Sequence, residues 1–318
     1  MDKRLQYLQQ RSELLRKLRK FFFDRDFIEV ETPLLSSEII PELHIEPMAL
    51  SRDATRHPAF LQASPELHMK RLIAEGLSSI FQVTRSFRAG ESGQLHNPEF
   101  TLVEWYRAGD DMQAGMTFLD ELCQSLLGTP PARRISYSEA FHSMLSICPH
   151  TATSKQLANC AEHHEVSIPA DMPTTDRDEW LNLLLAARIE PKLGLDSPTI
   201  LYDYPASQAA LAKLATRDDG TQVAERFELY FQGVELANGY HELTDSAELR
   251  GRLTQVNQHR EADSRLALPL PESLLAAMEL GLPDSSGCAL GFDRLVMLAV
   301  GAKSIGDVMA YNKQNNEG

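Results

Sequence analysis

Residues 87–106, FRAGESGQLHNPEFTLVEWY, join two apolar runs through a loop of polar and charged groups. The run before the loop, residues 80–87, alternates apolar and polar side chains. The run after it, residues 100–106, is rich in β-branched and aromatic side chains. Both patterns are typical of strands and together predict one antiparallel hairpin. Arg88 would then lie where the first strand ends.

The residue types of this hairpin suit a nucleotide. The guanidinium of Arg88 can present a planar pair of donors to phosphate oxygens. Asn97 offers amide groups, and Phe100 offers an aromatic face for a purine. A long surface hairpin with solvated charges would look the same, because hairpin loops are commonly polar for ordinary reasons. The loop alone therefore leaves both interpretations open.

A second motif lies near the C-terminus. Residues 287–297, GCALGFDRLVM, predict a strand of small residues that turns at Gly291 and enters an apolar helix with Arg294 in its first turn. Small residues let a ligand approach the backbone closely. Many α/β proteins carry such a turn without any nucleotide, so this motif is also weak when taken alone.

Together the two motifs resemble motifs 2 and 3 of the class II aminoacyl-tRNA synthetases. Residues 27–35, FIEVETPLL, resemble motif 1, in which a helix passes into a strand that ends here at Pro33. Residues 5–24 predict the amphipathic helix, which should pack on the sheet. The resemblance implies an α+β fold: a class II catalytic core with a mostly antiparallel sheet flanked by helices.

Further segments are similar to the lysine branch of that class. They are SPELHMKRL at 64–72, HNPEFT at 96–101 and GVELANGYHEL at 233–243. The resemblance runs from about residue 10 to about residue 305 and is weakest at 110–195. It implies a lysine-like amino acid as substrate.

The length bears on domain organisation. A lysine-branch synthetase carries an anticodon-binding barrel before motif 1, and about 25 residues are too few for a barrel. We therefore expect no anticodon-binding domain and one catalytic domain over residues 1–318. Residues 110–195 read mostly as helices, such as MQAGMTFLDELCQSLL, SKQLANCAEHHEV and DEWLNLLLAARI, and are expected to form a helical insertion. This short form resembles the synthetase paralogues that attach lysine or (R)-β-lysine to a protein, elongation factor P.

Composition excludes some classes of protein. Hydrophobic side chains make up 43% of the 318 residues, which is enough for a sizeable core. The formal net charge of -14 argues against a broad polyanion-binding surface, which would commonly be basic. No long apolar stretch indicates a signal peptide or a membrane span, so we expect a cytoplasmic protein. Cys123, Cys148, Cys160 and Cys288 lack paired metal spacing and are expected to be reduced thiols.

Two glutamates suggest a magnesium site. Glu228 and Glu235 lie on either side of 232–233 in a segment that reads as two strands, so their carboxylates could converge across a hairpin. Mg²⁺ is commonly held by one or two carboxylates together with phosphate oxygens and water. A solvent-facing ladder of charges is the alternative. In the lysine branch the matching glutamates bind the metals, and the resemblance implies the same here.

The resemblance also implies an amino acid pocket. Glu66 and Glu242, with the hydroxyl of Tyr106, are expected to hold the two amino groups, and Asn238 the carboxylate. Glu104 would help at the amino end. Such a pocket rejects an analogue that lacks the matching group, because its own polar atoms would stay unpaired. The full set implied for substrate binding is Ser64, Glu66, Glu104, Tyr106, Asn238, Glu242 and Ala289.

Ala289 is a departure from the lysine-branch synthetases, which have Gly at this place in motif 3. Its extra methyl would narrow the pocket near the amino acid backbone. Paralogues that share this Ala favour (R)-β-lysine, whose amino group is shifted by one carbon. We therefore expect the same preference here.

The resemblance places further residues at ATP. They are Arg88, Gly90, Glu91, His96, Asn97, Phe100, Glu235, Leu236, Gly291 and Arg294. Lysine-branch synthetases read Arg-Asn-Glu in motif 2, whereas this chain reads Arg-Ala-Gly-Glu from Arg88. The glutamate that meets the adenine amino group is therefore displaced by one, and either Gly90 or Glu91 lies at that contact.

The implied reaction has two steps. The amino acid carboxylate attacks the α-phosphate of ATP, with Arg88, Arg294 and Mg²⁺ stabilising the developing charge. An amine, by resemblance the ε-amino group of a lysine on elongation factor P, then attacks the activated carbonyl, and AMP leaves. Motif 1 implies a homodimer with Pro33 near its axis, and tRNA is not expected as a partner.

Two other functions fit the same sequence. One is a stand-alone enzyme that aminoacylates tRNA or a small amine without an anticodon domain. The other is a non-catalytic paralogue kept as a binding module, against which the intact Arg88, Glu228, Glu235 and Arg294 argue.

Overall fold

The computed structural model describes residues 3–51, 58–170 and 172–311. The chain divides into two compact units. The first comprises Met1–Asp111 with Leu243–Gly318, and the second comprises Met112–Glu242. Each unit is described separately below.

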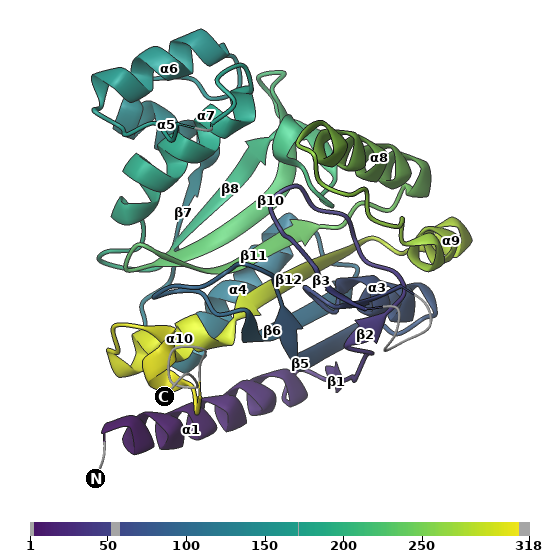
Figure 1. Cartoon of the computed structure of the whole chain (residues 1–318). Helices are drawn as coiled ribbons and strands as arrows, with labels where there is room; N and C mark the ends of the chain where they lie inside the picture. The colour runs from purple at the N-terminus through teal and green to yellow at the C-terminus, as the bar shows by residue number, and fades with distance from the viewer. Residues whose placement is uncertain (1–2, 52–57, 171, 312–318) are drawn as a thin grey trace. The chain divides into compact units, whose positions relative to one another are not determined.

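The first unit contains a four-stranded run of sheet in the order β1-β5-β6-β12. Strand β1 is parallel to β5, and the other neighbours are antiparallel. Figure 1 shows β6 between β5 and β12. A separate three-stranded sheet has the order β2-β4-β3. The strands are β1 (Ile28–Glu29), β2 (Leu35–Ser36), β3 (Met48–Leu50), β4 (Ala59–Leu61), β5 (Ser79–Phe87), β6 (Glu99–Ala108) and β12 (Ser285–Gly291).

Helices surround these strands. Helix α1 buries Leu18 and Phe22, and the ring of Phe22 stacks on Phe81 of β5 with centroids 4.3 Å apart. The predicted amphipathic helix therefore forms and packs on the sheet, as expected. The helices of this unit are α1 (Lys3–Phe23), α3 (Glu66–Ala74), α8 (Ser246–Ala262), α9 (Glu272–Gly281), α10 (Phe292–Val300) and the 3-10 helix η4 (Ile305–Val308).

The two predicted motifs of this unit are confirmed as local structure. Strands β5 and β6 pair in antiparallel register from Ser79 opposite Arg107 to Phe87 opposite Glu99. Strand β12 passes at Gly291 into α10, whose first turn carries Arg294. Gly291 has φ of -72°. This turn therefore does not need glycine for its backbone angle.

The second unit has its own strands in the order β11-β10-β8-β7, with β9 paired to β10. Strands β7 and β8 are parallel, and the other pairs are antiparallel. The strands are β7 (Arg133–Ser136), β8 (Thr199–Pro205), β9 (Leu214–Thr216), β10 (Gln222–Phe231) and β11 (Val234–His241). The helices are α4 (Met112–Leu127), α5 (Tyr137–Leu145), α6 (Ser154–His163), α7 (Arg177–Leu184), a π-helical turn (Leu185–Ile189) and the 3-10 helices Glu190–Lys192 and Ala206–Gln208.

The three quoted helical segments all form helices, as α4, α6 and α7. The N-termini of α5 and α6 are closed by capping boxes, Ser136 with Glu139 and Thr153 with Gln156. Residues 110–195 also contain strand β7, which the prediction of a helical insertion missed. Its side chain Ile135 is buried, and its pairing partner β8 lies far along the chain. All of the predicted insertion except residues 110–111 lies inside the second unit, and its status as an insertion in one catalytic domain stays a prediction.

The predicted hairpin around 232–233 is confirmed. Strands β10 and β11 are joined by a two-residue turn in which Gln232 and Gly233 have φ of 53° and 72°. Two positive φ values are typical of the hairpin turn whose twist matches the strands. No helix within the described ranges combines the length and apolar character needed to cross a membrane.

Candidate functional site

The first group of predicted residues forms an acidic cluster in the first unit. It consists of Ser64, Glu66, Lys70, Glu104 and Tyr106 and is called here the Glu104 cluster. Glu66 and Lys70 are one turn apart on α3, and Lys70 Nζ lies 2.5 Å from Glu66 Oε1. Tyr106 donates its hydroxyl to Glu104 Oε1 at 2.6 Å. Alternation along β6 puts Glu104 and Tyr106 on one face of the sheet.

Burial decides the electrostatics of this cluster. The side chain of Lys70 is 2% exposed, and Glu104 is 2% exposed. Burial, followed by the Glu66 carboxylate, raises the pKa of Glu104 to about 8. Hydrogen bonds from Tyr106 and Ser64 and the charge of Lys70 oppose this rise. Near neutral pH Glu104 is therefore mostly protonated, and the Lys70 ammonium balances the Glu66 carboxylate.

An entering ammonium group would change this balance. It would supply the second positive charge that lets Glu104 ionise. The cluster can therefore bind an amino group, which is the chemistry predicted for Glu66, Glu104 and Tyr106. Lys70 was missed by the sequence reasoning. The Glu-to-Lys spacing of four residues on a predicted helix was the signal that could have found it.

Ala289 lies beside this cluster. In the register of β12 and β6 it is directly opposite Glu104, on the strand that the small-residue motif predicted. Side chains of directly opposite residues are neighbours on one face of a sheet. The methyl of Ala289 is therefore a neighbour of the Glu104 side chain.

The second group lies around the loop between β5 and β6. Arg294 donates from Nε to the carbonyl of Leu95 at 3.1 Å, and its Nη2 lies 2.7 Å from His96 Nε2. Burial, followed by the charge of Arg294, lowers the pKa of His96. The imidazole is therefore neutral at physiological pH and can accept from the guanidinium. The structure thus brings the motif 3 arginine onto the motif 2 loop.

The motif 2 arginine lies on an aromatic ring. The guanidinium carbon of Arg88 is 5.0 Å from the ring centroid of Phe100, and Arg88 Nη1 is 3.8 Å from Glu91 Oε1. Gly90 has φ of 79°, and a Cβ there would meet nothing within 4 Å. Glycine is therefore favoured at this position by the backbone angle and not by lack of space.

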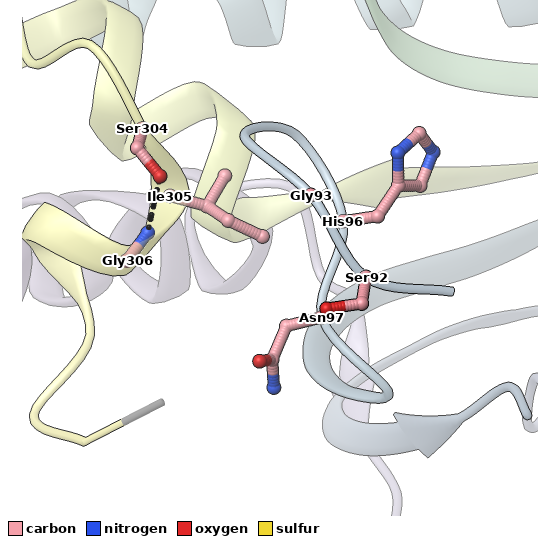
Figure 2. Close-up of a pocket in the computed structure, with 7 residues that line it drawn as sticks. All are labelled: Ser92, Gly93, His96, Asn97, Ser304, Ile305 and Gly306. Carbon is pink, nitrogen blue, oxygen red and sulfur yellow. Dashed lines mark hydrogen bonds between the residues drawn. The ribbon is translucent and has the colours of Figure 1, made fainter. Parts of the chain in front are cut away.

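The tip of this loop rests on the C-terminal turn. The carbonyl of Gln94 accepts from the Ile305 amide at 2.9 Å and from the Ser304 hydroxyl at 3.2 Å. Figure 2 shows the small polar pocket between the loop and this turn, with the Ser304 hydroxyl bonded to the Gly306 amide. The pocket is lined by Ser92, Gly93, His96, Asn97, Ser304, Ile305 and Gly306.

Asp293, next to Arg294, fastens the motif 3 helix to the hairpin. Its Oδ2 accepts from the amide of Thr101 on β6 at 2.7 Å, and its Oδ1 lies 2.7 Å from Nη1 of Arg11 on α1. Asp293 is 2% exposed. The sequence reasoning did not single it out, because nothing local to the motif indicates that its partners are as far along the chain as Thr101 and Arg11.

The third group lies on the β10–β11 hairpin of the second unit. Glu228 is opposite Asn238, and Arg226 is opposite Tyr240. The register then shifts between Leu229 and Tyr230: Leu229 is opposite Ala237 and Tyr230 is opposite Glu235, so that the extra residue of a β-bulge, Leu236, lies on β11. The extra residue shifts the alternation by one, so that Glu235 shares a face with Asn238 although they are three positions apart.

Glu228 is buried and engaged. Its Oε2 accepts from the hydroxyls of Tyr204 and Tyr230, each at 2.5 Å, and its Oε1 lies 2.5 Å from Nη2 of Arg226. Burial, followed by the Glu228 carboxylate, holds the pKa of both tyrosines well above the ordinary value. Both hydroxyls therefore stay protonated and donate. Glu242, just beyond β11, is 1% exposed.

The predicted site residues thus fall into sets within each unit. Ser64, Glu66, Glu104, Tyr106 and Ala289 gather around the Glu104 cluster. Arg88, Gly90, Glu91, His96, Asn97 and Phe100 lie on the motif 2 hairpin, with Arg294 bonded to it and Gly291 at the start of α10. Glu228, Glu235, Leu236, Asn238 and Glu242 belong to the second unit.

Comparison with known proteins bears on the whole chain. The family described as tRNA synthetases class II (D, K and N) matches residues 1–315. Three relatives, each named elongation factor P--(R)-beta-lysine ligase, come from Salmonella dublin, Salmonella gallinarum and Salmonella paratyphi B. Each is 45% identical over 308 residues, which cover 96% of this chain and 94% of the relative.

Proposed function

The chain belongs to the class II tRNA synthetases of the D, K and N family, and on that basis we propose that it is an ATP-dependent ligase that lysylates a protein. It activates (R)-β-lysine, or lysine, as an aminoacyl-adenylate. It then transfers the aminoacyl group to the ε-amino group of a lysine on elongation factor P. The near full-length match to ligases of that name carries this proposal, and the buried Glu104 cluster supports it.

The amino acid is recognised by its charges. Glu66, Glu104, Tyr106 and Glu242 bind the two amino groups, with Ser64 at the edge of the Glu104 cluster. Ala289, opposite Glu104, narrows the space that an α-amino group would use and favours the β-amino acid. Asn238 binds the carboxylate through its amide.

ATP binds to the motif 2 hairpin and to Arg294. Its phosphate oxygens replace the Leu95 carbonyl and His96 as partners of the Arg294 guanidinium. Arg88 leaves the ring face of Phe100 for the α-phosphate, and the ring face takes the adenine. Asn97, Glu91, Gly291 and Leu236 complete the nucleotide site, and the loop turns at Gly90, which has a positive φ.

Mg²⁺ is expected with ATP. Of its two predicted ligands, Glu235 suits the ion better than Glu228. Glu235 is partly exposed and fits a site of one carboxylate with phosphate oxygens and water. Glu228 already accepts from two hydroxyls and a guanidinium, which leaves little room for a cation. When bound, the ion neutralises charge on the phosphates.

The chemistry needs positioning and charge stabilisation. In the first step an oxygen of the amino acid carboxylate attacks the α-phosphorus, the bond to the β-phosphate oxygen breaks, and pyrophosphate leaves. Arg88 and Arg294 stabilise the charge on the phosphate oxygens. In the second step the acceptor amine attacks the carbonyl carbon, loses a proton, and AMP leaves with both electrons of the broken bond. The product is an amide.

The partners follow from this function. The acceptor is elongation factor P, the compartment is the cytoplasm where translation takes place, and the enzyme is a homodimer built around motif 1. A minimal aminoacyl-tRNA ligase is the second candidate, because the matching family is one of tRNA synthetases.

One experiment separates the candidates. Purified elongation factor P is incubated with the enzyme, ATP, Mg²⁺ and (R)-β-lysine, and its intact mass is measured beside a tRNA aminoacylation assay. A gain of one lysyl unit on the protein, with tRNA uncharged, is the expected result. Charged tRNA with unmodified protein would instead establish the second candidate, and activity on neither would overturn both.

A further inference from the structure

Arg226 on β10 links the buried Glu228 to Asn238. Its Nη2 lies 2.5 Å from Glu228 Oε1, its Nε lies 3.2 Å from Asn238 Oδ1, and its Nη1 lies 3.2 Å from the carbonyl of Gln208. The guanidinium carbon is also 4.5 Å from the ring centroid of Tyr204. Every nitrogen of this guanidinium is engaged, so its position is fixed from several directions.

The contact with Arg226 fixes the orientation of the Asn238 amide. The two ends of an Asn side chain are otherwise hard to tell apart, and the surrounding hydrogen bonds decide between them. A guanidinium can only donate, so the atom that faces it must be the oxygen. The amide nitrogen then lies on the other side, where it donates to the hydroxyl of Tyr240 at 2.8 Å.

This orientation leaves one amide hydrogen for a ligand. The Asn238 nitrogen carries two hydrogens, and Tyr240 accepts one of them. A second N–H held in a fixed direction is a good partner for a carboxylate oxygen. If the amide rotated, its oxygen would face the carboxylate and repel it.

Glu228 in turn holds Arg226. Two tyrosine hydroxyls fill the acceptor positions of Glu228 Oε2, so the carboxylate cannot turn away from the guanidinium without losing both. Arg226 and Glu228 are two positions apart on β10 and share a face, and their opposite neighbours on β11 are Tyr240 and Asn238. Five side chains of the second unit therefore form one chain of hydrogen bonds that ends at the Asn238 amide.

We propose that Arg226 is a positioning residue that fixes the Asn238 amide with its N–H toward the carboxylate of the amino acid substrate, and that Glu228 is the anchor of Arg226. This inference rests on the proposed function, because it concerns the amino acid that the enzyme activates. It assigns Glu228 primarily to amino acid binding and leaves Glu235 as the carboxylate for the metal ion. If Glu228 serves amino acid binding, its loss should change KM for the amino acid. If it is a metal ligand, its loss should change the Mg²⁺ requirement.

The test is amino acid-dependent exchange of pyrophosphate into ATP by Arg226→Lys and Glu228→Gln. Lys keeps the charge but cannot reach Asn238, Glu228 and Gln208 together. We expect each variant to raise KM for (R)-β-lysine about tenfold or more, since a hydrogen bond to a charged group is lost. KM for ATP and the Mg²⁺ concentration for half-maximal activity should stay at the wild-type values.

Cadaverine has two amino groups and no carboxylate. Its inhibition of the enzyme therefore measures binding of the amino groups separately from binding of the carboxylate. Its inhibition constant should be the same for wild type and both variants, because Arg226 acts only on the carboxylate end. A loss of cadaverine binding equal to the loss of amino acid binding would mean general disruption and would overturn the inference. So would a Glu228→Gln enzyme whose only defect is a raised Mg²⁺ requirement.

Two further variants keep the test decisive. Glu225→Gln, on the same strand, removes a carboxylate that pairs with Arg217 and His241 outside this network, and it should behave as wild type. Tyr204→Phe keeps the ring beside Arg226 and removes one hydroxyl from Glu228, so it should fold and raise KM for the amino acid about threefold. If KM for the amino acid were unchanged in both Tyr204→Phe and Arg226→Lys, this inference would be overturned but the proposed function would stand. Absence of exchange by the wild type with any lysine isomer would overturn the proposed function and the inference with it.

Discussion

At the scale of single residues, Glu104 dominates the electrostatics of the Glu104 cluster, the proposed amino acid site. Its pKa is raised to about 8 from an ordinary value of 4.5. Between these two pH values the folded protein holds a proton that the unfolded chain has lost. The stabilising effect of this group is therefore complete below about pH 4.5 and is lost as the pH rises through about 8.

We predict that the free energy of unfolding contributed by Glu104 falls by roughly 3–5 kcal/mol from pH 4.5 to pH 8. The measurement is urea denaturation across this pH range for wild type and Glu104→Gln, whose neutral amide has no proton to lose. The difference between the two curves should carry this slope. Parallel curves would mean that Glu104 is ionised in the folded protein.

At the same scale, we propose that Ala289, which lies opposite Glu104 on the neighbouring strand, determines which lysine isomer is preferred. We predict that Ala289→Gly shifts the ratio of kcat/KM for lysine over (R)-β-lysine upward by about tenfold or more, because one methyl in a pocket carries about that discrimination. Adenylate formation with each isomer measures it. Cys288→Ala removes a side chain from the next position on the same strand, which points to the other face, and should leave the ratio unchanged. The same ratio in both variants would contradict the role of the methyl.

At the scale of elements, Asp293 joins three parts of the first unit. It bonds α10 to β6 through the Thr101 amide and to α1 through Arg11. We predict that Asp293→Asn lowers the free energy of unfolding by roughly 3 kcal/mol, because Arg11 loses its buried counter-charge. Chemical denaturation measures the loss, and hydrogen exchange at the Thr101 amide should become faster.

A surface ion pair of α1, the helix that carries Arg11, provides a comparison for the loss of stability. Arg19 pairs with Glu29 while their side chains are 39% and 26% exposed. Arg19→Gln should therefore cost less than about 1 kcal/mol. Equal losses for Arg19→Gln and Asp293→Asn would show that the buried pair has no special weight in joining the elements.

At the scale of the whole molecule, apolar side chains remain exposed around motif 1. Phe23, Ile28, Leu34 and Leu35, on both sides of Pro33, are between 37% and 52% exposed. Exposed apolar side chains gathered in one segment are typical of an interaction surface. This supports the homodimer expected from the motif.

We predict that light scattering after gel filtration gives twice the chain mass for the wild type, and that Leu35→Glu gives the monomer mass, because a charge would be buried at the interface. Leu280 is 91% exposed on α9, so Leu280→Glu is the matched control and should stay dimeric. A monomeric wild type would refute the prediction, and a dimeric Leu35→Glu would move the interface elsewhere.

The local elements could be predicted from the sequence. The hairpin of β5 and β6, the strand-to-helix turn of β12 and α10, and the hairpin at Gln232 and Gly233 all form where periodicity and turn residues predicted them. Each depends on residues that are neighbours along the chain, and these patterns are visible in a single sequence. The residue types of the Glu104 cluster other than Lys70 were predicted by resemblance for the same reason.

Strand β7 and the bulge in β11 were decided only by tertiary structure. Residues 133–136 form a strand because they pair with β8, which lies more than 60 positions later in the chain. The bulge turns Glu235 onto the face of Asn238, and no rule of alternation predicts it. Such features depend on partners that a single sequence does not identify.

The sequence by itself determined the family and the reaction, and by resemblance it predicted the residues that would meet the ligands, because motif residues and their spacing are local. Tertiary structure alone decided the state of those residues: the proton on Glu104, the Lys70 ammonium beside Glu66, and the Arg226 guanidinium that orients Asn238. Burial and hydrogen-bond partners set protonation and orientation, and both exist only once distant segments have packed together.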